Sequence, residues 1–241
     1  PPVALSFGEK VIKSNKIEGD LIVPIPIGTY GNLSVVTAPP KTKKTFFISL
    51  LASCYLSGSN QFGGDIKGHK GNDGQLVHID TEQGLWHCQK VFERVHKMDS
   101  NIDSEIYHTF GLRSIDYKMR IEFIDYYLRE KIKTPSLVII DGIADLCSDA
   151  NNISESNQVV QKLMEWSAKY KCHIINVIHQ NFGSSKLGTG HLGSFLEKKA
   201  ETVIQLEANT VNKDWVTVKC GRSRGYAFET FSFEVNEFGL P

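Results

Sequence analysis

A lysine-rich turn between two apolar stretches is the feature that most constrains how this 241-residue chain can fold. The apolar residues 33–36 predict a buried strand before the turn, and the apolar residues 46–51 predict a helix after it. Lys41, Lys43 and Lys44 stand in the turn itself. Three cations at a helix start oppose the helix dipole, unless a polyanion occupies the site. The order of strand, turn and helix therefore predicts an anion-binding site formed by backbone N–H groups.

The turn partly matches the phosphate-binding P-loop pattern G-x-x-x-x-G-K-[ST], with Ala38 and Lys43 in place of the two glycines. The chemically active end of the pattern is present, because Lys44 can reach the β- and γ-phosphates of ATP and the Thr45 hydroxyl can ligate Mg²⁺. Taken alone, the stretch also fits an ordinary turn with solvated lysines. The residues that we expect to contact ATP are Ala38, Pro39, Pro40, Lys41, Thr42, Lys43, Lys44 and Thr45.

Length and composition limit the domain count and the class of protein. With 241 residues, of which 41% are hydrophobic, the chain can form one sizeable α/β domain or at most two small ones. Its 27 Lys and Arg residues balance its 27 Asp and Glu residues, so nucleic-acid binding has to rest on local basic clusters. The five cysteines are scattered without a metal-binding spacing, which is typical of buried thiols in a reducing compartment.

The apolar runs and the first residues bear on localisation. No apolar run approaches the roughly 18 residues of a membrane-spanning helix, so we expect no membrane segment and a cytoplasmic protein. The chain begins with Pro1 and lacks an initial Met, from which we expect it to be part of a longer protein.

Strand-like and helix-like stretches alternate from residue 33 to residue 178, which predicts a parallel sheet with helices on both faces. The expected strands are residues 33–37, 75–79, 105–110, 137–140 and 172–178, and the expected helices are residues 44–56, 85–95, 115–132 and 154–170. Residues 202–206, 215–219 and 228–235 then resemble consecutive strands that extend the sheet in antiparallel fashion. We expect residues 1–27 to be a lead-in segment, residues 28–241 to be the domain, and residues 57–74 and 179–193 to be long loops that are functional or mobile.

Asp141 ends the apolar run 137–140, as in the Walker B pattern. A carboxylate at the carboxyl end of a parallel strand lies at the crevice where ligands bind, so Asp141 could hold Mg²⁺ through water opposite Thr45. The alternative is that Asp141 ends the strand as a helix cap. Gly142 follows it, so the catalytic Glu that many ATPases carry at that position is absent.

Glu82 replaces the absent carboxylate in our interpretation. It follows the expected strand 75–79 and would emerge on the same rim as Lys44, where it can polarise the water that attacks the γ-phosphate. The alternative is that Asp80 or Thr81 caps the following helix and that Glu82 is an acid of its first turn. We favour capping for Asp80 and catalysis for Glu82.

Polar and cationic residues near the end of the chain complete the candidate site. Gln180 follows the expected strand 172–178 and could hydrogen-bond the γ-phosphate, reporting its presence to the glycine-rich loop behind it. For His179, a structural hydrogen bond is the favoured interpretation. Arg222 and Arg224 fit either a solvated hairpin turn or a pair of fingers that reach the ATP of a neighbouring subunit.

These residues together resemble the RecA-like ATPase superfamily, which includes recombinases and hexameric replicative helicases of the RepA and DnaB type. Within it, the chain is similar to ATPases of Bacteroidetes mobilizable elements and plasmids, described as AAA-family or RepA-like. The resemblance covers nearly the whole chain, including residues 139–142, 179–181, 199–203 and 233–237. It implies a RecA-like three-layer α/β domain with a mainly parallel central sheet and antiparallel C-terminal strands.

The same resemblance implies roles for single residues. Lys44, Thr45, Asp141 and Glu82 take the roles around ATP and Mg²⁺. Gln180 takes the sensor role, and Arg222 and Arg224 take the finger role.

The function expected from these residues is that of an ATP-dependent, helicase-like DNA motor that serves replication or mobilisation of a mobile element. Its partners would be DNA, single-stranded and bound without sequence preference, and further copies of the chain in a ring or filament. The loop with Lys186 and His191 would face the DNA. The alternative is a non-hydrolysing nucleotide-binding regulatory module with a degenerate P loop. A small-molecule phosphotransferase ranks last, because the sequence shows no acceptor pocket.

Overall fold

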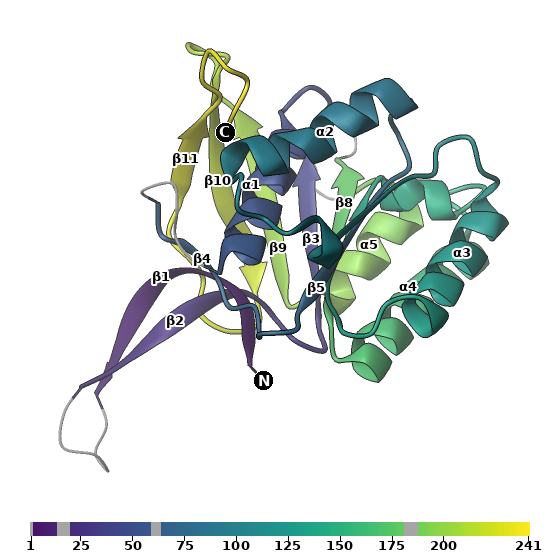
Figure 1. Ribbon diagram of the computed structural model, residues 1–241, viewed down its shortest axis with the longest axis horizontal. Helices are drawn as coiled ribbons and strands as arrows, with labels where there is room; N and C mark the ends of the chain where they lie inside the picture. The colour runs from purple at the N-terminus through teal and green to yellow at the C-terminus, as the bar shows by residue number, and fades with distance from the viewer. Residues whose placement is uncertain (1, 14–19, 59–63, 181–187) are drawn as a thin grey trace.

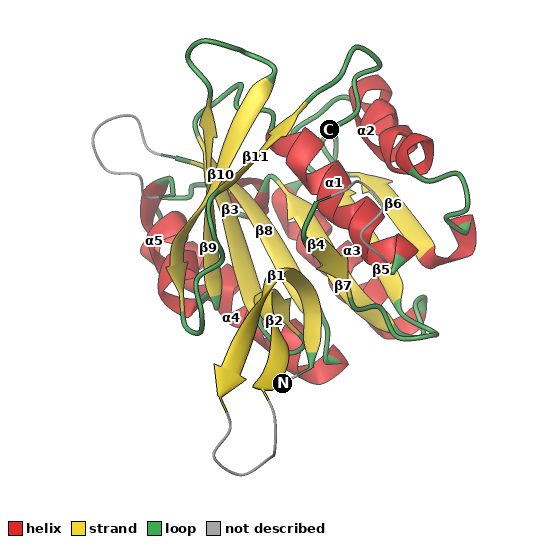
Figure 2. Ribbon diagram, turned by 90° about the vertical axis from the view of Figure 1, so that its left-hand side faces the viewer, coloured by secondary structure: helices red, strands yellow, loops and turns green. Residues whose placement is uncertain are grey.

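A computed structural model describes residues 2–13, 20–58, 64–180 and 188–241. The central element of the fold is an eight-stranded sheet with helices on both faces (Figures 1 and 2). Its strands are β3 (Leu33–Ala38), β5 (Gln75–Asp80), β6 (Tyr107–Gly111), β7 (Pro135–Asp141), β8 (His173–His179), β9 (Thr202–Ala208), β10 (Trp215–Ser223) and β11 (Phe231–Glu234).

The strand order is β11-β10-β9-β3-β8-β7-β5-β6. All neighbours from β9 to β6 pair in parallel, whereas β9, β10 and β11 pair in antiparallel fashion. A mainly parallel sheet with antiparallel strands at the C-terminal edge was expected from the sequence, and the structure confirms it.

The period-two geometry of each strand divides the core between two helix layers. On β7, Ile139 faces the core under α1 (Lys44–Ser57) and α2 (Leu85–Met98), and Ile140 faces the opposite core. The opposite core lies under α3 (Tyr117–Glu130), α4 (Ile153–Tyr170) and α5 (Gly190–Lys199). Because parallel strands are covered on both faces, they appear in the sequence as continuous apolar runs. Two short 3₁₀ helices, η1 (Ser104–Ile106) and η2 (Ile143–Leu146), complete the described helical segments.

A second sheet of three antiparallel strands lies beside α1. It has the order β2-β1-β4 and consists of β1 (Val3–Lys13), β2 (Asp20–Thr29) and β4 (Ile66–Gly68). The sequence interpretation assigned no strands here, because Pro24 and Pro26 interrupt the pattern of β2. Proline is tolerated at this place because β2 is an edge strand. The boundary that we placed at residue 28 falls inside β2 and stays a prediction.

The loop expected over residues 179–193 is also partly wrong, because α5 begins at Gly190. Gly190 and Gly193 weaken the helical signal in the sequence. Gly193 is nonetheless required, since a Cβ there would lie 2.2 Å from the carbonyl carbon of Gly188. Of the helices in the described ranges, none combines the length and the apolarity that a membrane crossing requires.

Candidate nucleotide-binding site

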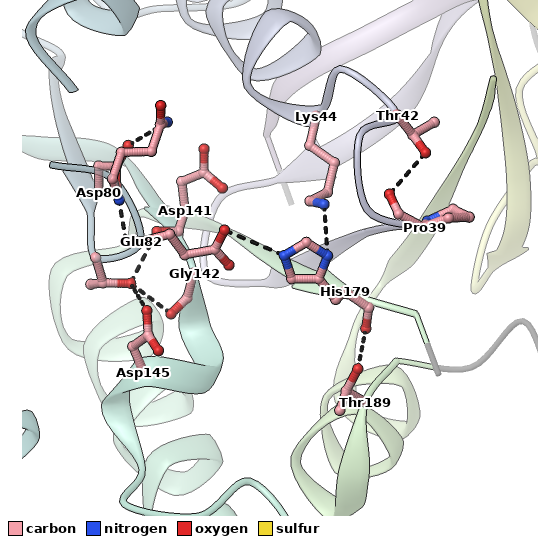
Figure 3. Close-up of polar contacts among 12 residues, drawn as sticks. Pro39, Thr42, Lys44, Asp80, Glu82, Asp141, Gly142, Asp145, His179 and Thr189 are labelled. Atoms are coloured by element: carbon pink, nitrogen blue, oxygen red, sulfur yellow. Dashed lines mark hydrogen bonds and ion pairs between the residues drawn. The ribbon is translucent and has the colours of Figure 1, made fainter. Parts of the chain in front are cut away.

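The carboxyl ends of four parallel strands meet at one rim of the central sheet and deliver the candidate residues (Figure 3). The register aligns Ala38 of β3 with His179 of β8, and Asp80 of β5 with Asp141 of β7. The loop that follows β3 leads into α1, and the turn that follows β5 carries Glu82. In open parallel sheets this rim is where ligands bind.

The turn between β3 and α1 has an unusual backbone. Lys41 and Lys43 adopt left-handed conformations, with φ angles of 64° and 56°. Such a conformation costs a residue with a Cβ about 1–2 kcal/mol, which is why glycine commonly occupies it. The Thr42 hydroxyl donates to the Pro39 carbonyl over 2.8 Å and holds the turn together. Two lysines thus adopt, with strain, the backbone geometry that glycines usually supply.

Lys44 is buried, with 8% of its surface exposed, and its ammonium Nζ lies 3.0 Å from Nδ1 of His179. Burial lowers the pKa of Lys44, and the nearby carboxylates of Glu82 and Asp141 oppose that shift. An ammonium group can only donate hydrogen bonds, so His179 Nδ1 accepts in this contact.

Glu82 lies on the other side of the same imidazole ring. Its Oε2 is 3.4 Å from His179 Nε2, and the hydrogen bond from His179 is the main cause of the lowered pKa of Glu82. The backbone N–H of Glu82 donates to Oδ1 of Asp80 over 3.0 Å. Helix α2 begins only at Leu85, with Gly84 as its N-cap and no acid in its first turn. Asp80 therefore caps the turn after β5, the expectation that it caps helix α2 is wrong, and Glu82 is not a first-turn acid.

Asp141 is almost completely buried, with 2% exposed, and its Oδ2 has no hydrogen-bond partner within the part of the chain that the structure describes. Burial raises the pKa of Asp141 well above its ordinary value, and the carboxylates of Asp80 and Glu82 raise it further. An unpartnered buried carboxylate fits a cation, and Mg²⁺ commonly takes one or two carboxylates together with substrate phosphates. No group of three His, Cys, Asp or Glu among the described residues is arranged to hold a metal ion by itself.

Gly142, the residue after Asp141, makes room for Glu82. Its φ is +99°, and a Cβ at this position would lie 2.3 Å from Oγ1 of Thr81 and 2.6 Å from Cγ of Glu82. Thr81 binds this junction together, since its hydroxyl lies 2.8 Å from the Gly142 carbonyl and 3.0 Å from Oδ2 of Asp145. Gly142 thus stands where many ATPases carry the catalytic Glu, and the side chain of Glu82 packs against it.

Gln180 lies at the rim, but its amide is directed toward the strand that enters the P loop. Nε2 donates to Oγ1 of Thr37 over 3.2 Å, and the backbone N–H donates to the Ala38 carbonyl over 3.0 Å. Lys186, which we expected to face DNA, lies outside the described residues. His191 is exposed on the first turn of α5.

Arg222 and Arg224 lie away from the P loop. Arg222 is part of β10 rather than of a turn, and Ser223 pairs with Thr202 at the start of β9, near the end of the sheet opposite the rim. Arg222 Nη1 is 3.4 Å from the Glu197 carbonyl, and Arg224 Nη2 is 3.2 Å from the carbonyls of Lys198 and Lys199. Both side chains are exposed and contact the C-terminal end of α5, where cations are favoured. They do not reach the site of their own subunit.

His179 is the residue whose place in the site the sequence interpretation missed. It was taken as a structural hydrogen bonder, whereas the structure places its ring between Lys44 and Glu82 (Figure 3). The available signal was its position at the carboxyl end of the strand next to β3.

A mainly parallel sheet with a basic strand-to-helix turn and an acidic neighbouring strand end is the arrangement of a RecA-like P-loop domain. A protein-family model described as "AAA domain" matches residues 25–184, more than half of the chain, and the chain belongs to that family. Among solved structures it is similar to one described as "Crystal structure of the RadB recombinase". The sequence identity is 16%, the TM-score is 0.60, and the match covers 88% of this chain and 90% of that one. This likeness shows the RecA-like fold. A search of curated proteins found no match.

Proposed function

We propose that this chain binds ATP with Mg²⁺ at the sheet rim and hydrolyses it as a helicase-like DNA motor. The observation that carries the proposal is that Lys44 and Glu82 both contact the imidazole ring of His179, with the carboxylate of Asp141 close enough to act on the charge of Lys44. The proposed role in replication or mobilisation of a mobile genetic element rests on the sequence resemblance alone.

The residues divide the chemistry as follows. The N-terminal N–H groups of α1 and the ammonium of Lys44 would bind the phosphates, since a helix N-terminus favours anions. Thr45 and Asp141 would hold Mg²⁺, which when bound neutralises charge on the phosphate oxygens. The ionised carboxylate of Glu82, whose pKa is lowered, can accept the proton of the attacking water.

A short backbone connection would transmit the nucleotide state to α5. The carbonyl of His179 accepts hydrogen bonds from both N–H and Oγ1 of Thr189, each 2.8 Å long, and Thr189 is the N-cap residue of α5. A phosphate that draws Lys44 away from His179 would therefore act on a residue that also anchors the segment proposed to face DNA. Gln180, the residue after β8, donates to Thr37 on the strand that leads into the P loop, and it would sense the nucleotide through that strand.

The proposed partner is single-stranded DNA, bound without sequence preference. The recombinase likeness of the fold supports a nucleic-acid role, and the balanced net charge requires the binding to be local. One or two cations per subunit add up when several subunits line a channel.

A second candidate is a nucleotide-binding module that does not hydrolyse ATP. It is favoured by Ala38 and Lys43, which stand in place of the two glycines of the pattern, and by the strained backbone of Lys43. Steady-state phosphate release, with and without single-stranded DNA, compared between wild type and Lys44→Ala, separates the candidates. The motor predicts release that DNA stimulates and that Lys44→Ala abolishes. Bound ATP without release, in both the presence and absence of DNA, would support the module instead.

Arg222 and Arg224 would act on the ATP of a neighbouring subunit, since they lie far from their own P loop. Mixing Lys44→Ala subunits with Arg222→Ala/Arg224→Ala subunits tests this, because intact sites form only at mixed interfaces. Partial recovery of phosphate release is expected. No recovery at any ratio would show that the arginines do not act between subunits.

A further inference from the structure

The outer half of the β1–β2 hairpin is a two-stranded ribbon that projects from the body of the molecule (Figure 1). Strand β4 pairs only with the residues of β1 from Leu5 to Phe7. Beyond Glu9, the described residues of β1 and β2 pair only with each other. An isolated two-stranded ribbon is marginally stable in water, and both of its edges offer unpaired backbone groups.

This ribbon exposes apolar side chains on both faces. Val11 pairs with Ile22, and Ile12 pairs with Leu21, so that successive pairs face opposite sides. The exposed fractions are 54% for Val11, 49% for Leu21 and 60% for Ile22. Exposed apolar residues gathered on a projecting element mark an interaction site rather than a solvated surface.

The charges of the ribbon identify the kind of partner. Its described outer residues carry two acids, Glu9 and Asp20, and two bases, Lys10 and Lys13. Lys13 pairs with Asp20 across the strands, and Glu9 forms an ion pair with Lys67 over 2.8 Å. A ribbon whose charges cancel does not attract a polyanion such as DNA. Its exposed apolar side chains instead fit a protein surface that also exposes apolar groups.

The ribbon lies next to the segment that carries Arg222 and Arg224, the two arginines that we propose to reach a neighbouring subunit. Nζ of Lys10 lies 3.7 Å from the ring centroid of Tyr226, two residues after Arg224, and Tyr226 is itself 45% exposed. Any subunit that receives Arg222 and Arg224 at its nucleotide site would therefore also meet the ribbon.

The opposite end of the molecule offers a matching apolar surface. Leu85 and Trp86 follow directly on the turn that carries Glu82, and they are 73% and 61% exposed. Figure 1 shows α2 at the end of the molecule opposite the hairpin. A contact between these two ends joins different surfaces of identical subunits, and such heterologous contacts build rings or filaments.

We propose that the outer half of the β1–β2 hairpin is an assembly arm that docks beside Leu85 and Trp86 on the nucleotide-site rim of a second copy of this chain. The inference rests on the proposed function, in which Arg222 and Arg224 act on that same neighbour. It adds that the apolar arm, and not the arginines, provides the stability of the contact.

Sedimentation velocity with ATP and Mg²⁺, over a range of protein concentrations, tests the arm. Ile22→Glu is compared with Ile153→Glu, the same change at a site of equal exposure on α4, 59% against 60%. Wild type and Ile153→Glu are expected to assemble, and Ile22→Glu is expected to need at least tenfold more protein. A second variant replaces residues 11–22 by Asn-Gly, a two-residue turn that closes the shortened hairpin, and it should be monomeric. Circular dichroism and ATP binding by each variant report whether the fold and the site are retained.

Mixing gives the sharpest outcome. Ile22→Glu and Leu85→Glu subunits each lose one side of the contact. At a concentration at which wild type assembles, each should stay monomeric alone and the mixture should stop at a dimer with one intact interface. If wild type, Ile22→Glu and the shortened hairpin assemble equally, the proposal of an assembly arm is wrong. The proposals for ATP hydrolysis and for Arg222 and Arg224 would still stand. Wild type that stays monomeric at every concentration would overturn the action between subunits together with the arm.

Discussion

Nδ1 of His179 lies 3.0 Å from Nζ of Lys44, and the opposite ring nitrogen lies 3.4 Å from the carboxylate of Glu82. One imidazole ring thus connects the lysine proposed to bind phosphate with the carboxylate proposed to activate water. Because the Lys44 ammonium can only donate, Nδ1 of His179 accepts in this contact. A proton on Nδ1 would face the ammonium group and break the contact.

His179→Ala should lower ATP turnover by up to about 10²-fold, because a displaced catalytic group loses productive geometry. Nucleotide binding should change much less, since Lys44 and the N-terminus of α1 remain. Phosphate release and equilibrium binding of ATP measure the two effects separately. His87→Ala, which removes an exposed histidine of α2, is the control. Equal turnover in wild type and His179→Ala would show that the ring contacts matter only without nucleotide.

Glu82→Gln should abolish hydrolysis while sparing ATP binding, because it removes the base and keeps the size of the side chain. General-base catalysis contributes roughly 10²–10⁴-fold to rate. Single-turnover hydrolysis, measured with enzyme in excess over ATP, reports this step directly. Unchanged turnover in Glu82→Gln would transfer the role to Asp80 or another carboxylate.

Lys43→Gly should give a more stable protein than Lys43→Ala, by about 1 kcal/mol, because only glycine adopts the φ of 56° without strain. Both variants lose the ion pair between Lys43 and Asp214, which is 2.7 Å long. The difference between their free energies of unfolding therefore reports the cost of the left-handed backbone conformation. Urea denaturation measures it. A Lys43→Ala protein as stable as Lys43→Gly would mean that the turn relaxes out of the left-handed conformation.

Asp141→Asn should stabilise the nucleotide-free protein at neutral pH by about 1–3 kcal/mol, because it removes a buried acid with an unpartnered oxygen. The folded-state pKa of Asp141 is raised, so its contribution to stability is full below the unfolded pKa and is lost as pH rises toward the folded pKa. The gain of the variant over wild type should therefore be small near the ordinary pKa of Asp and grow as pH rises.

Unfolding curves of wild type and Asp141→Asn at several pH values test this, since titrating groups that do not interact with Asp141 cancel in the difference. The same variant should lose the stabilisation that ATP with Mg²⁺ gives to wild type. A gain that does not change with pH would show that the carboxylate is not the source of the instability.

The location of the site could be predicted because it depends on order along the chain. Strands that are buried on both faces are long apolar runs, and parallel strands place their carboxyl ends at one rim. Lys44, Glu82 and Asp141 each follow such a run, so the sequence by itself placed them together. The β1–β2 hairpin was not predicted, because Pro24 and Pro26 are unfavourable in most strands and are tolerated only at a sheet edge. Helix α5 was not predicted either, because Gly190 and Gly193 have low helix propensity.

Sequence alone determined the RecA-like fold class and the rim at which the P loop, Glu82 and Asp141 meet, since these follow from local periodicity and the direction of parallel strands. Only the tertiary structure decided that His179 joins Lys44 to Glu82, that Gly142 clears space for Glu82, and that Arg222 and Arg224 lie far from their own P loop. Those relationships depend on side-chain contacts between strands that lie far apart in the chain. Such contacts are set by the packing of neighbouring strands and carry no local signal.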